Sequence, residues 1–185
     1  SIFKTELIDR LKEHFKPTPY GRRVIMTTGI GESFLADKIK DWEEALPDFM
    51  SLAYLPQYGM VRLRLDARHE NEKLLQECLD NQIQKLKEII SDYIFSYDDK
   101  PISEVIVNML KERNLSLSTA ESCTGGSIAR MITSVPGCSY IYKGSVIAYD
   151  SKVKEELLNV NHDDIEKYNV VSQEVAEQMA IGAHN

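Results

Sequence analysis

The chain has 185 residues, a formal net charge of −7 and 28% charged residues. This length allows one or two compact domains, and a hydrophobic content of 43% excludes a low-complexity or disordered chain. The acidic balance gives no bulk support for binding to nucleic acid or to an anionic membrane.

Targeting signals and disulfides are not expected. No apolar stretch approaches the roughly 20 residues that a membrane span needs. The first residues carry acid and lack a long apolar core, so we expect no signal peptide. The cysteines are Cys78, Cys123 and Cys138, an odd and sparse set that favours a reducing compartment. We therefore expect a cytoplasmic protein without a membrane partner.

The first hundred residues predict a small α+β module preceded by a short helix. Apolar spacing predicts this helix over residues 2–15, ended by prolines 17 and 19. The pattern then predicts a strand at 23–28, a helix at 32–45, a hairpin from 51–55 and 60–65, and a long amphipathic helix at 71–94. The order is β-α-β-β-α, and residues 95–101 are expected to form a linker.

The remaining residues predict alternating helices and strands. Helices are expected at 101–113, 126–135, 151–159 and after residue 172, with strands at 115–119 and 144–149. Residues 162–164 are expected to form a solvated turn or cap. Such alternation is typical of a parallel or mixed α/β sheet. Because only two strands are clear, the chain is expected to stop within this domain.

The glycine-containing turn at residues 120–126 is the most informative motif of the chain. It follows an apolar alternating strand and precedes a helix, so it lifts a small hydroxyl or thiol to the mouth of a sheet. The backbone N–H groups of the first helical turn would face the same space. We therefore expect a nucleophile and an anion site side by side.

Amide hydrolysis needs a nucleophile, a proton acceptor and donors for the oxyanion. Ser122 lies on the turn, and a lysine held neutral by burial could accept its proton. Tyr149 and Lys154 stand at the end of one predicted strand and the start of the next helix. Lys152 competes with Lys154, but their directions on a helix differ by about 200°, so at most one faces Ser122.

Each candidate also has a structural alternative. Ser122 could cap the helix. Cys123 could be the nucleophile, as a thiolate at a helix N-terminus, or a small buried filler. Lys154 could be an ordinary exposed lysine and Tyr149 a sheet residue with its hydroxyl in water. Glu121 could bind substrate or merely favour the positive end of the helix.

The chain resembles the CinA family (competence/damage-inducible protein A) in a series of short words that keep the family's order. These are Thr-Gly-Ile-Gly-Glu-Ser at 28–33, Leu-Ala-Tyr-Leu-Pro at 52–56, Ala-Glu-Ser-Cys-Thr-Gly-Gly at 120–126, Val-Pro-Gly at 135–137, Val-Ile-Ala-Tyr at 146–149, Val-Lys-Glu-Glu-Leu-Leu at 153–158, and the pairs at 171–172, 175–176 and 179–180. Together they cover nearly all of the chain and are highly specific, although none would suffice alone.

The family layout implies an α/β fold class with an α+β middle module. Residues 1–20 resemble the tail of a molybdopterin-binding-like domain, residues 21–98 a KH-like module, and residues 99–185 the first half of an amidase domain. Most of the N-terminal domain, linked in the family to ADP-ribose pyrophosphatase activity and the place for any divalent metal, is expected to be missing. The family's later Gly-Ile-Ala-Gly-Pro segment is also missing, so this chain alone is expected to show little or no activity.

The resemblance implies hydrolysis of nicotinamide mononucleotide to nicotinic acid mononucleotide and ammonia, in pyridine nucleotide recycling. It implies Ser122 as nucleophile, Lys154 as base, and Tyr149 assisting proton transfer or orienting the lysine. The substrate-binding candidates are Glu121, Thr124, Gly125 and Gly126. The amides near Thr124 and the two glycines could hold either the oxyanion or the substrate phosphate. No cofactor or metal is required for the amidase, and a homodimer is expected.

A nucleic-acid-binding function is the main alternative, because KH-like folds hold single-stranded RNA in other proteins. Arg62, Arg64 and Arg68 form a basic stripe that could contact nucleic acid, although such alternation is more typical of the wet face of a hairpin. No Gly-x-x-Gly loop between helices is visible, which makes nucleic acid the less favoured partner. A third alternative is a structural module that spaces two catalytic domains in a dimer.

Overall fold

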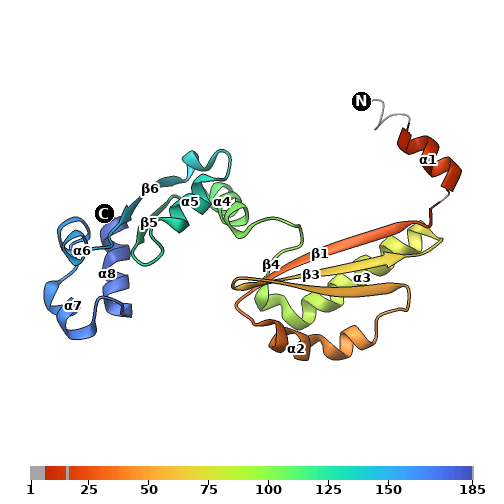
Figure 1. The fold of residues 1–185 in the computed structure, drawn as a ribbon, viewed down its shortest axis with the longest axis horizontal. Coiled ribbons are helices and arrows are strands. Elements are labelled where there is room, and N and C mark those ends of the chain that lie inside the picture. Colours follow the sequence, from red (N-terminus) through yellow and green to blue (C-terminus); the bar gives the residue numbers. More distant parts are fainter. Residues whose placement is uncertain (1–6, 16, 185) are drawn as a thin grey trace. The chain divides into compact units, whose positions relative to one another are not determined.

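The computed structural model describes residues 7–15 and 17–184, which form two compact units, residues 1–100 and 101–185 (Figure 1). Helix α1 spans Ile8–Phe15, and the earlier part of the helix expected over residues 2–15 lies outside the described residues. Within the described ranges, no helix has both the length and the apolar character that a membrane crossing requires.

The first unit contains a four-stranded antiparallel sheet with the strand order β2-β3-β1-β4. Its elements are β1 (Tyr20–Thr28), α2 (Glu32–Glu44), β2 (Met50–Gln57), β3 (Met60–Arg68), α3 (Glu72–Ile90), the 3₁₀ turn η2 (Ser91–Tyr93) and β4 (Ile94–Ser96). The predicted β-α-β-β-α order is confirmed, with one additional strand at its end.

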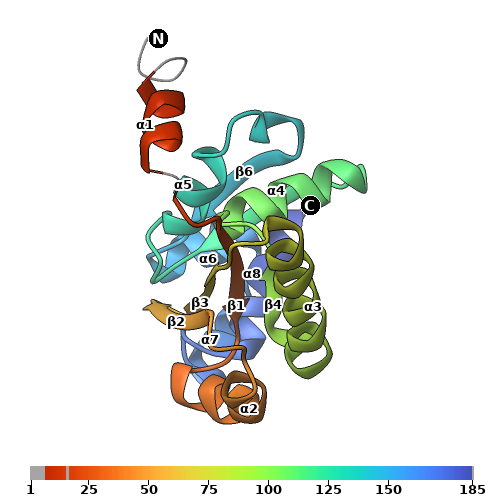
Figure 2. The same cartoon turned by 90° about the vertical axis from the view of Figure 1, so that its right-hand side faces the viewer.

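Alternation along β3 explains how this unit builds its core. Val61, Leu63 and Leu65 are buried, while the arginines between them lie on the other face of the sheet. Helices α2 and α3 cover the apolar face (Figures 1 and 2). The two helices are also joined by a buried hydrogen bond, in which Trp42 Nε1 donates to Gln82 Oε1 at 2.9 Å.

The end of this unit differs from the prediction. The helix expected over residues 71–94 ends at Ile90, because η2 turns the chain back toward the sheet. Residues Ile94–Ser96 then pair with β1, so the segment expected as a linker over 95–101 begins in a strand. A strand of three residues is too short to show an alternating pattern, and only its partner reveals it.

The second unit alternates helices with two parallel strands. Its elements are α4 (Ile102–Glu112), β5 (Leu117–Glu121), α5 (Ser127–Thr133), the 3₁₀ turn η3 (Cys138–Tyr140), β6 (Tyr142–Ile147), α6 (Ser151–Leu158), α7 (His162–Tyr168) and α8 (Gln173–His184). The ladder runs from Leu117 opposite Tyr142 to Glu121 opposite Ile147. The predicted fold class, α/β with an α+β module, is confirmed.

Two element boundaries in this unit differ from the prediction. Strand β5 ends at Glu121, two residues later than expected, so Glu121 belongs to the sheet and Ser122 is the first residue of the turn. Residues 162–164 do not form a solvated turn but begin helix α7. The Asn161 side chain caps this helix by accepting from the Asp163 N–H at 2.8 Å.

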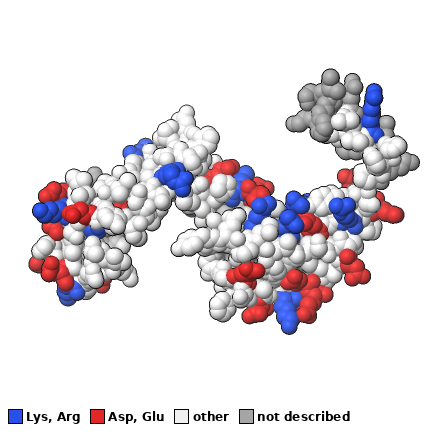
Figure 3. Space-filling model, in the orientation of Figure 1, with Lys and Arg blue, Asp and Glu red and all other residues white. Residues whose placement is uncertain are grey.

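The arginine stripe of the first unit is largely paired with carboxylates. Figure 3 shows Lys and Arg gathered along the sheet side of this unit, with Asp and Glu predominating over its helices. Asp66 lies 2.7 Å from Arg22 Nε and 2.8 Å from Arg64 Nε, and Arg62 pairs with Asp99. These contacts reduce the positive charge that the stripe could offer to phosphates.

Candidate active site

Parallel pairing of β5 and β6 brings the two predicted parts of the site together. The carboxyl ends of parallel strands lie at the same edge of a sheet, where α/β proteins place their ligands. Ser122 follows the last residue of β5, and Ala148 follows the last residue of β6. The Ala148 N–H donates to the Glu121 carbonyl oxygen at 2.7 Å, so the two strands stay joined up to this edge.

Lys154 reaches this edge from α6 and is fully buried, with 0% of its surface exposed. Its Nζ lies 3.1 Å from Ser122 Oγ, 2.5 Å from the Ala148 carbonyl oxygen and 3.4 Å from the Tyr149 carbonyl oxygen. No carboxylate forms an ion pair with Lys154 among the described residues. A buried ammonium without a counter-ion is costly, so this environment is unusual for a lysine.

The competing lysine lies elsewhere. Lys152 is exposed, and its backbone N–H donates to the Asp150 side chain at 2.8 Å, as part of the cap of α6. Lys154, one half-turn further along the helix, faces inward and contacts Ser122. The reading of Lys154 as an ordinary exposed lysine is therefore wrong.

Tyr149 contributes its main chain to the observed site. Its side chain is 76% exposed, and its hydroxyl makes no hydrogen bond within the described part of the chain. Its carbonyl oxygen is one of the acceptors around Lys154 Nζ, so it helps to orient the amine. A role of the hydroxyl in proton transfer stays a prediction.

Glu121 occupies the backbone amides that sequence reasoning offered to a ligand. Only 2% of Glu121 is exposed, and its carboxylate accepts from Ile128 N–H at 2.9 Å and Ala129 N–H at 2.8 Å. Desolvation by burial acts to raise the pKa of Glu121, but the hydrogen bonds from these amides and from Thr124 and Ser145 outweigh it, and the net pKa is lowered. The expectation of a vacant anion site in the first turn of α5 is therefore wrong: the carboxylate fills it.

The turn itself also excludes one alternative for Ser122. Helix α5 begins at Ser127 after Gly126, which has a φ of +90°, so Ser122 lies too early to be its N-cap. The observed partner of the Ser122 hydroxyl is Lys154. The Gly126 position favours glycine for its backbone, and a Cβ there would lie 2.8 Å from Ile147 Cδ1, the flexible end of a half-exposed side chain that would have to move aside.

Several amides of the turn remain available. The Gly125 N–H donates to the Ser122 carbonyl oxygen at 3.0 Å and is therefore used within the turn. In the described residues, no protein acceptor receives the N–H groups of Cys123, Thr124 or Gly126. Of the amides predicted to hold an oxyanion or a phosphate, the structure thus leaves those of Thr124 and Gly126, together with that of Cys123.

A cavity of about 260 Å³ opens beside Ser122. It is lined by Ala120, Glu121, Ser122, Cys123, Thr124, Ile128, Val170, Val171, Ser172, Ala176 and Met179. Sequence reasoning gave no role to the lining residues from 170 onward, although the family words at 171–180 were a signal for them. Cys123 is exposed, so the reading of it as a buried filler is wrong. The lining contains no Lys or Arg.

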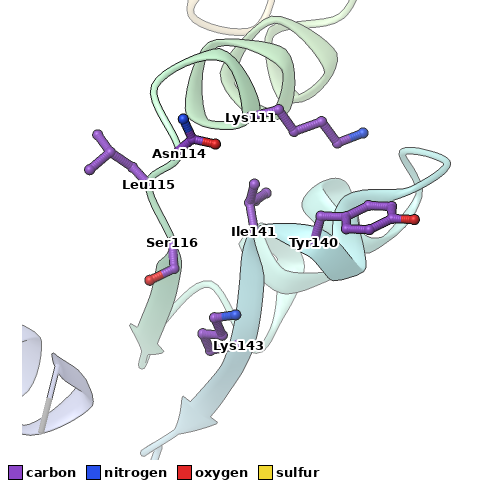
Figure 4. Close-up of a pocket in the computed structure, with 7 residues that line it drawn as sticks. All are labelled: Lys111, Asn114, Leu115, Ser116, Tyr140, Ile141 and Lys143. Atoms are coloured by element: carbon purple, nitrogen blue, oxygen red, sulfur yellow. The ribbon is translucent and has the colours of Figure 1, made fainter.

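A larger cavity of about 550 Å³ lies at the opposite ends of β5 and β6, near Lys111, Tyr140 and Lys143 (Figure 4). Figure 4 shows that the two lysine side chains extend from different elements and do not converge on one point. In the described ranges, no group of three or more His, Cys, Asp or Glu side chains is arranged to hold a metal ion.

Comparisons with known proteins agree with this organisation. Residues 99–185 match the family described as "CinA C-terminal domain", and residues 22–96 match "Damage-inducible protein CinA KH domain". A CinA-like protein of Flavobacterium psychrophilum is 44% identical over 180 residues, which are 97% of this chain and 43% of that protein. A second, from Cytophaga hutchinsonii, is 42% identical over 172 residues, covering 93% and 41%.

A solved structure of the competence/damage-inducible protein from Agrobacterium tumefaciens is 34% identical, with a TM-score of 0.44, and covers 44% of this chain and 50% of that one. This chain spans less than half the length of the two CinA-like relatives. Two successive CinA family models, for the KH and the C-terminal domain, account for most of its residues, and the chain belongs to the CinA family.

Proposed function

We propose that the protein, in its full natural length, hydrolyses the carboxamide of nicotinamide mononucleotide to nicotinic acid mononucleotide and ammonia. The observation that carries this proposal is the fully buried Lys154 amine, 3.1 Å from Ser122 Oγ at the mouth of the parallel strands. The choice of substrate rests on the resemblance to the CinA amidase domain, and the geometry supports the type of reaction.

The hydrogen bonds around Lys154 suit a base. An uncharged amine has two N–H groups and one lone pair, whereas carbonyl oxygens can only accept. If the two N–H groups donate to the Ala148 and Tyr149 carbonyl oxygens, the lone pair remains for the Ser122 hydroxyl proton. The same arrangement returns that proton to the leaving nitrogen later in the reaction.

The reaction proceeds in two stages. Ser122 Oγ bonds to the carboxamide carbon while its proton moves to Lys154, and the carbonyl oxygen becomes an oxyanion. The C–N bond then breaks, and ammonia departs with the proton that Lys154 gives back. In the second stage a water molecule loses a proton to Lys154, attacks the ester, and releases the carboxylic acid and the Ser122 hydroxyl.

The available amides of the turn suit the oxyanion better than the phosphate. In hydrolases with a nucleophile on a strand-to-helix turn, the N–H of the residue after the nucleophile is an oxyanion donor. In this chain that residue is Cys123, and the Thr124 N–H is the next available donor. Because no Lys or Arg lines the 260 Å³ cavity, we assign the cavity to the aromatic carboxamide end of the substrate.

The test is ammonia release from nicotinamide mononucleotide by the protein in its full natural length. Ser122→Ala should lower kcat/KM by about 10⁴-fold or more, because the covalent path is lost. Ser127→Ala is a matched control: this serine is the first residue of α5, directly after the turn, is exposed, and has no place in the proposed chemistry.

Two results would count against the proposal. Wild-type protein that releases no ammonia would contradict the substrate, and hydrolysis by Ser122→Ala at the rate of Ser127→Ala would contradict the nucleophile. Cys123→Ala removes the neighbouring thiol but keeps its backbone amide. A loss with this variant as large as that with Ser122→Ala would transfer the role of nucleophile to the thiol.

A further inference from the structure

We infer that Glu121 is a positioning residue for the Ser122–Lys154 pair, an assignment that rests on the proposed function and deepens it. Glu121 is the last residue of β5 and stands directly before the nucleophile. Its buried carboxylate binds two backbone amides at the start of α5. The hydroxyl of Ser122 is thereby held at a fixed place between the strand and the helix.

The contacts show how this restraint works. The Glu121 backbone is held in the sheet by the Ala148 N–H, at 2.7 Å from the Glu121 carbonyl oxygen. Its side chain spans the turn and accepts from Ile128 and Ala129, seven and eight residues further on. The Glu121 side chain therefore connects the two ends of the five-residue turn, residues 122–126. Ser122 is the first of them, so loss of this connection would move its Oγ relative to Lys154 Nζ.

The position of the negative charge adds a second argument. Glu121 and Lys154 are both buried at this edge of the sheet, yet no ion pair or hydrogen bond joins them within the described residues. The carboxylate charge is instead stabilised by backbone amides at the positive start of a helix. A direct pair with Glu121 would stabilise the ammonium form of Lys154, which cannot accept the serine proton. The amides of α5 thus keep the glutamate away from the base.

The decisive variant is Glu121→Gln in the protein of full natural length. Glutamine has nearly the same shape, but it carries no charge and presents an NH₂ group toward one of the two helix amides. We expect kcat to fall by about 100-fold, because a displacement of about 1 Å between reacting groups has that effect. KM should change by less than about threefold, since substrate contacts are retained. Glu156→Gln, an exposed glutamate of α6, is the matched control.

A second readout separates this role from the choice of substrate. The rate at which a fluorophosphonate probe labels Ser122 reports the reactivity of the hydroxyl without any nucleotide. We expect Glu121→Gln to slow labelling as strongly as it lowers kcat, and amide hydrogen exchange at Ile128 and Ala129 to accelerate. Wild-type protein that labels rapidly but releases no ammonia from the nucleotide would contradict the proposed substrate alone.

The inference is overturned if Glu121→Gln labels Ser122 at the wild-type rate, or if kcat stays within about threefold of wild type. If this variant does not fold, Glu121→Asp replaces it in the test. Aspartate keeps the negative charge, but its shorter side chain moves the carboxylate away from the amides of α5. Labelling of the folded aspartate variant at the wild-type rate would equally overturn the inference, and slower labelling at unchanged melting temperature would support it.

Discussion

The two units of the chain bury different kinds of side chain. In the first unit, a continuous apolar cluster packs between one face of the sheet and helices α2 and α3. Its two buried polar side chains among the described residues are neutral and hydrogen-bonded within the unit: Thr27 Oγ1 donates to the Val61 carbonyl oxygen at 2.8 Å, and Gln82 Oε1 accepts from Trp42 Nε1. The second unit has two smaller apolar clusters, and it contains both buried ionisable side chains of the described residues, Glu121 and Lys154.

This difference distinguishes the second unit, for which we propose a catalytic role, from the first. Burying an ionisable group costs free energy unless partners compensate, so a sequence selected only for stability would avoid it. Glu121 has compensating amides, whereas Lys154 has carbonyl oxygens, a serine hydroxyl and a cavity beside that serine. We therefore expect activity to depend on the second unit and the first unit to contribute mainly stability.

The largest expected effect is on activity, from Lys154→Met. Methionine fills a similar volume but cannot accept a proton, so kcat should fall by about 1,000-fold. Lys152→Met on the exposed side of the same helix should keep wild-type kcat. Steady-state ammonia release measures both. Equal rates for the two variants would contradict the role of Lys154 as the base, and with it the catalytic role that we propose for the second unit.

The next effect is on stability of the second unit. Gly126→Ala should lower the free energy of unfolding by about 2 kcal/mol, because its φ of +90° is strained for a residue with a Cβ and the flexible end of Ile147 must move aside. Gly125→Ala is the comparison, because Gly125 has a φ of +57° but nothing within 4 Å of its Cβ position. It should cost about 1 kcal/mol. Urea unfolding measures the difference, and equal losses would contradict the additional strain expected at Gly126.

A variant of the first unit should separate stability from activity. Trp42→Phe removes the buried hydrogen bond to Gln82 and some packing between α2 and α3, and should cost about 2 kcal/mol in free energy of unfolding. Ammonia release below the unfolding transition should equal that of wild type. A changed KM or kcat in the folded variant would show that the first unit takes part in the reaction.

The smallest expected effect is a pH dependence. The folded-state pKa of Glu121 lies below its ordinary value of 4.5. Its contribution to stability is therefore complete above that value and is lost as the pH falls through the folded-state pKa. Urea midpoints measured between about pH 6 and pH 3 should fall more steeply for wild type than for Glu121→Gln, which lacks this titration. Parallel curves would contradict an ionised, amide-bound carboxylate.

Helices and strands with a clear hydrophobic periodicity could be predicted from the sequence. Elements that are defined by strand pairing or by a capping side chain could be predicted less well. The β-α-β-β-α order follows from alternation in residues such as Val61 and Leu63 and from helical spacing. Strand β4 and helix α7 were missed because each is short and is recognised by pairing or capping. Likewise, the choice between Lys152 and Lys154 follows from helix geometry only once the direction of α6 is known.

The site shows the same division. The motif at residues 120–126 could be placed at the end of a strand from the sequence, because a strand and a glycine turn leave a recognisable pattern, and it holds the nucleophile that we propose. For Glu121 the sequence left two roles open, and the structure shows the one at the positive end of the helix, where its carboxylate accepts from two amides of α5. The expectation of a vacant anion site in that first turn was wrong, because this carboxylate fills it. The carbonyl oxygens of Ala148 and Tyr149 are invisible in the sequence, because every residue type carries one.

The most direct test of the central claim is to identify the atom that carries the acyl group during turnover. Rapid acid quenching of the protein with nicotinamide mononucleotide, followed by digestion and mass spectrometry, should find the nicotinoyl group esterified to Ser122. An acyl group found on Cys123 instead, with Ser122 unmodified at every quench time, would contradict the account.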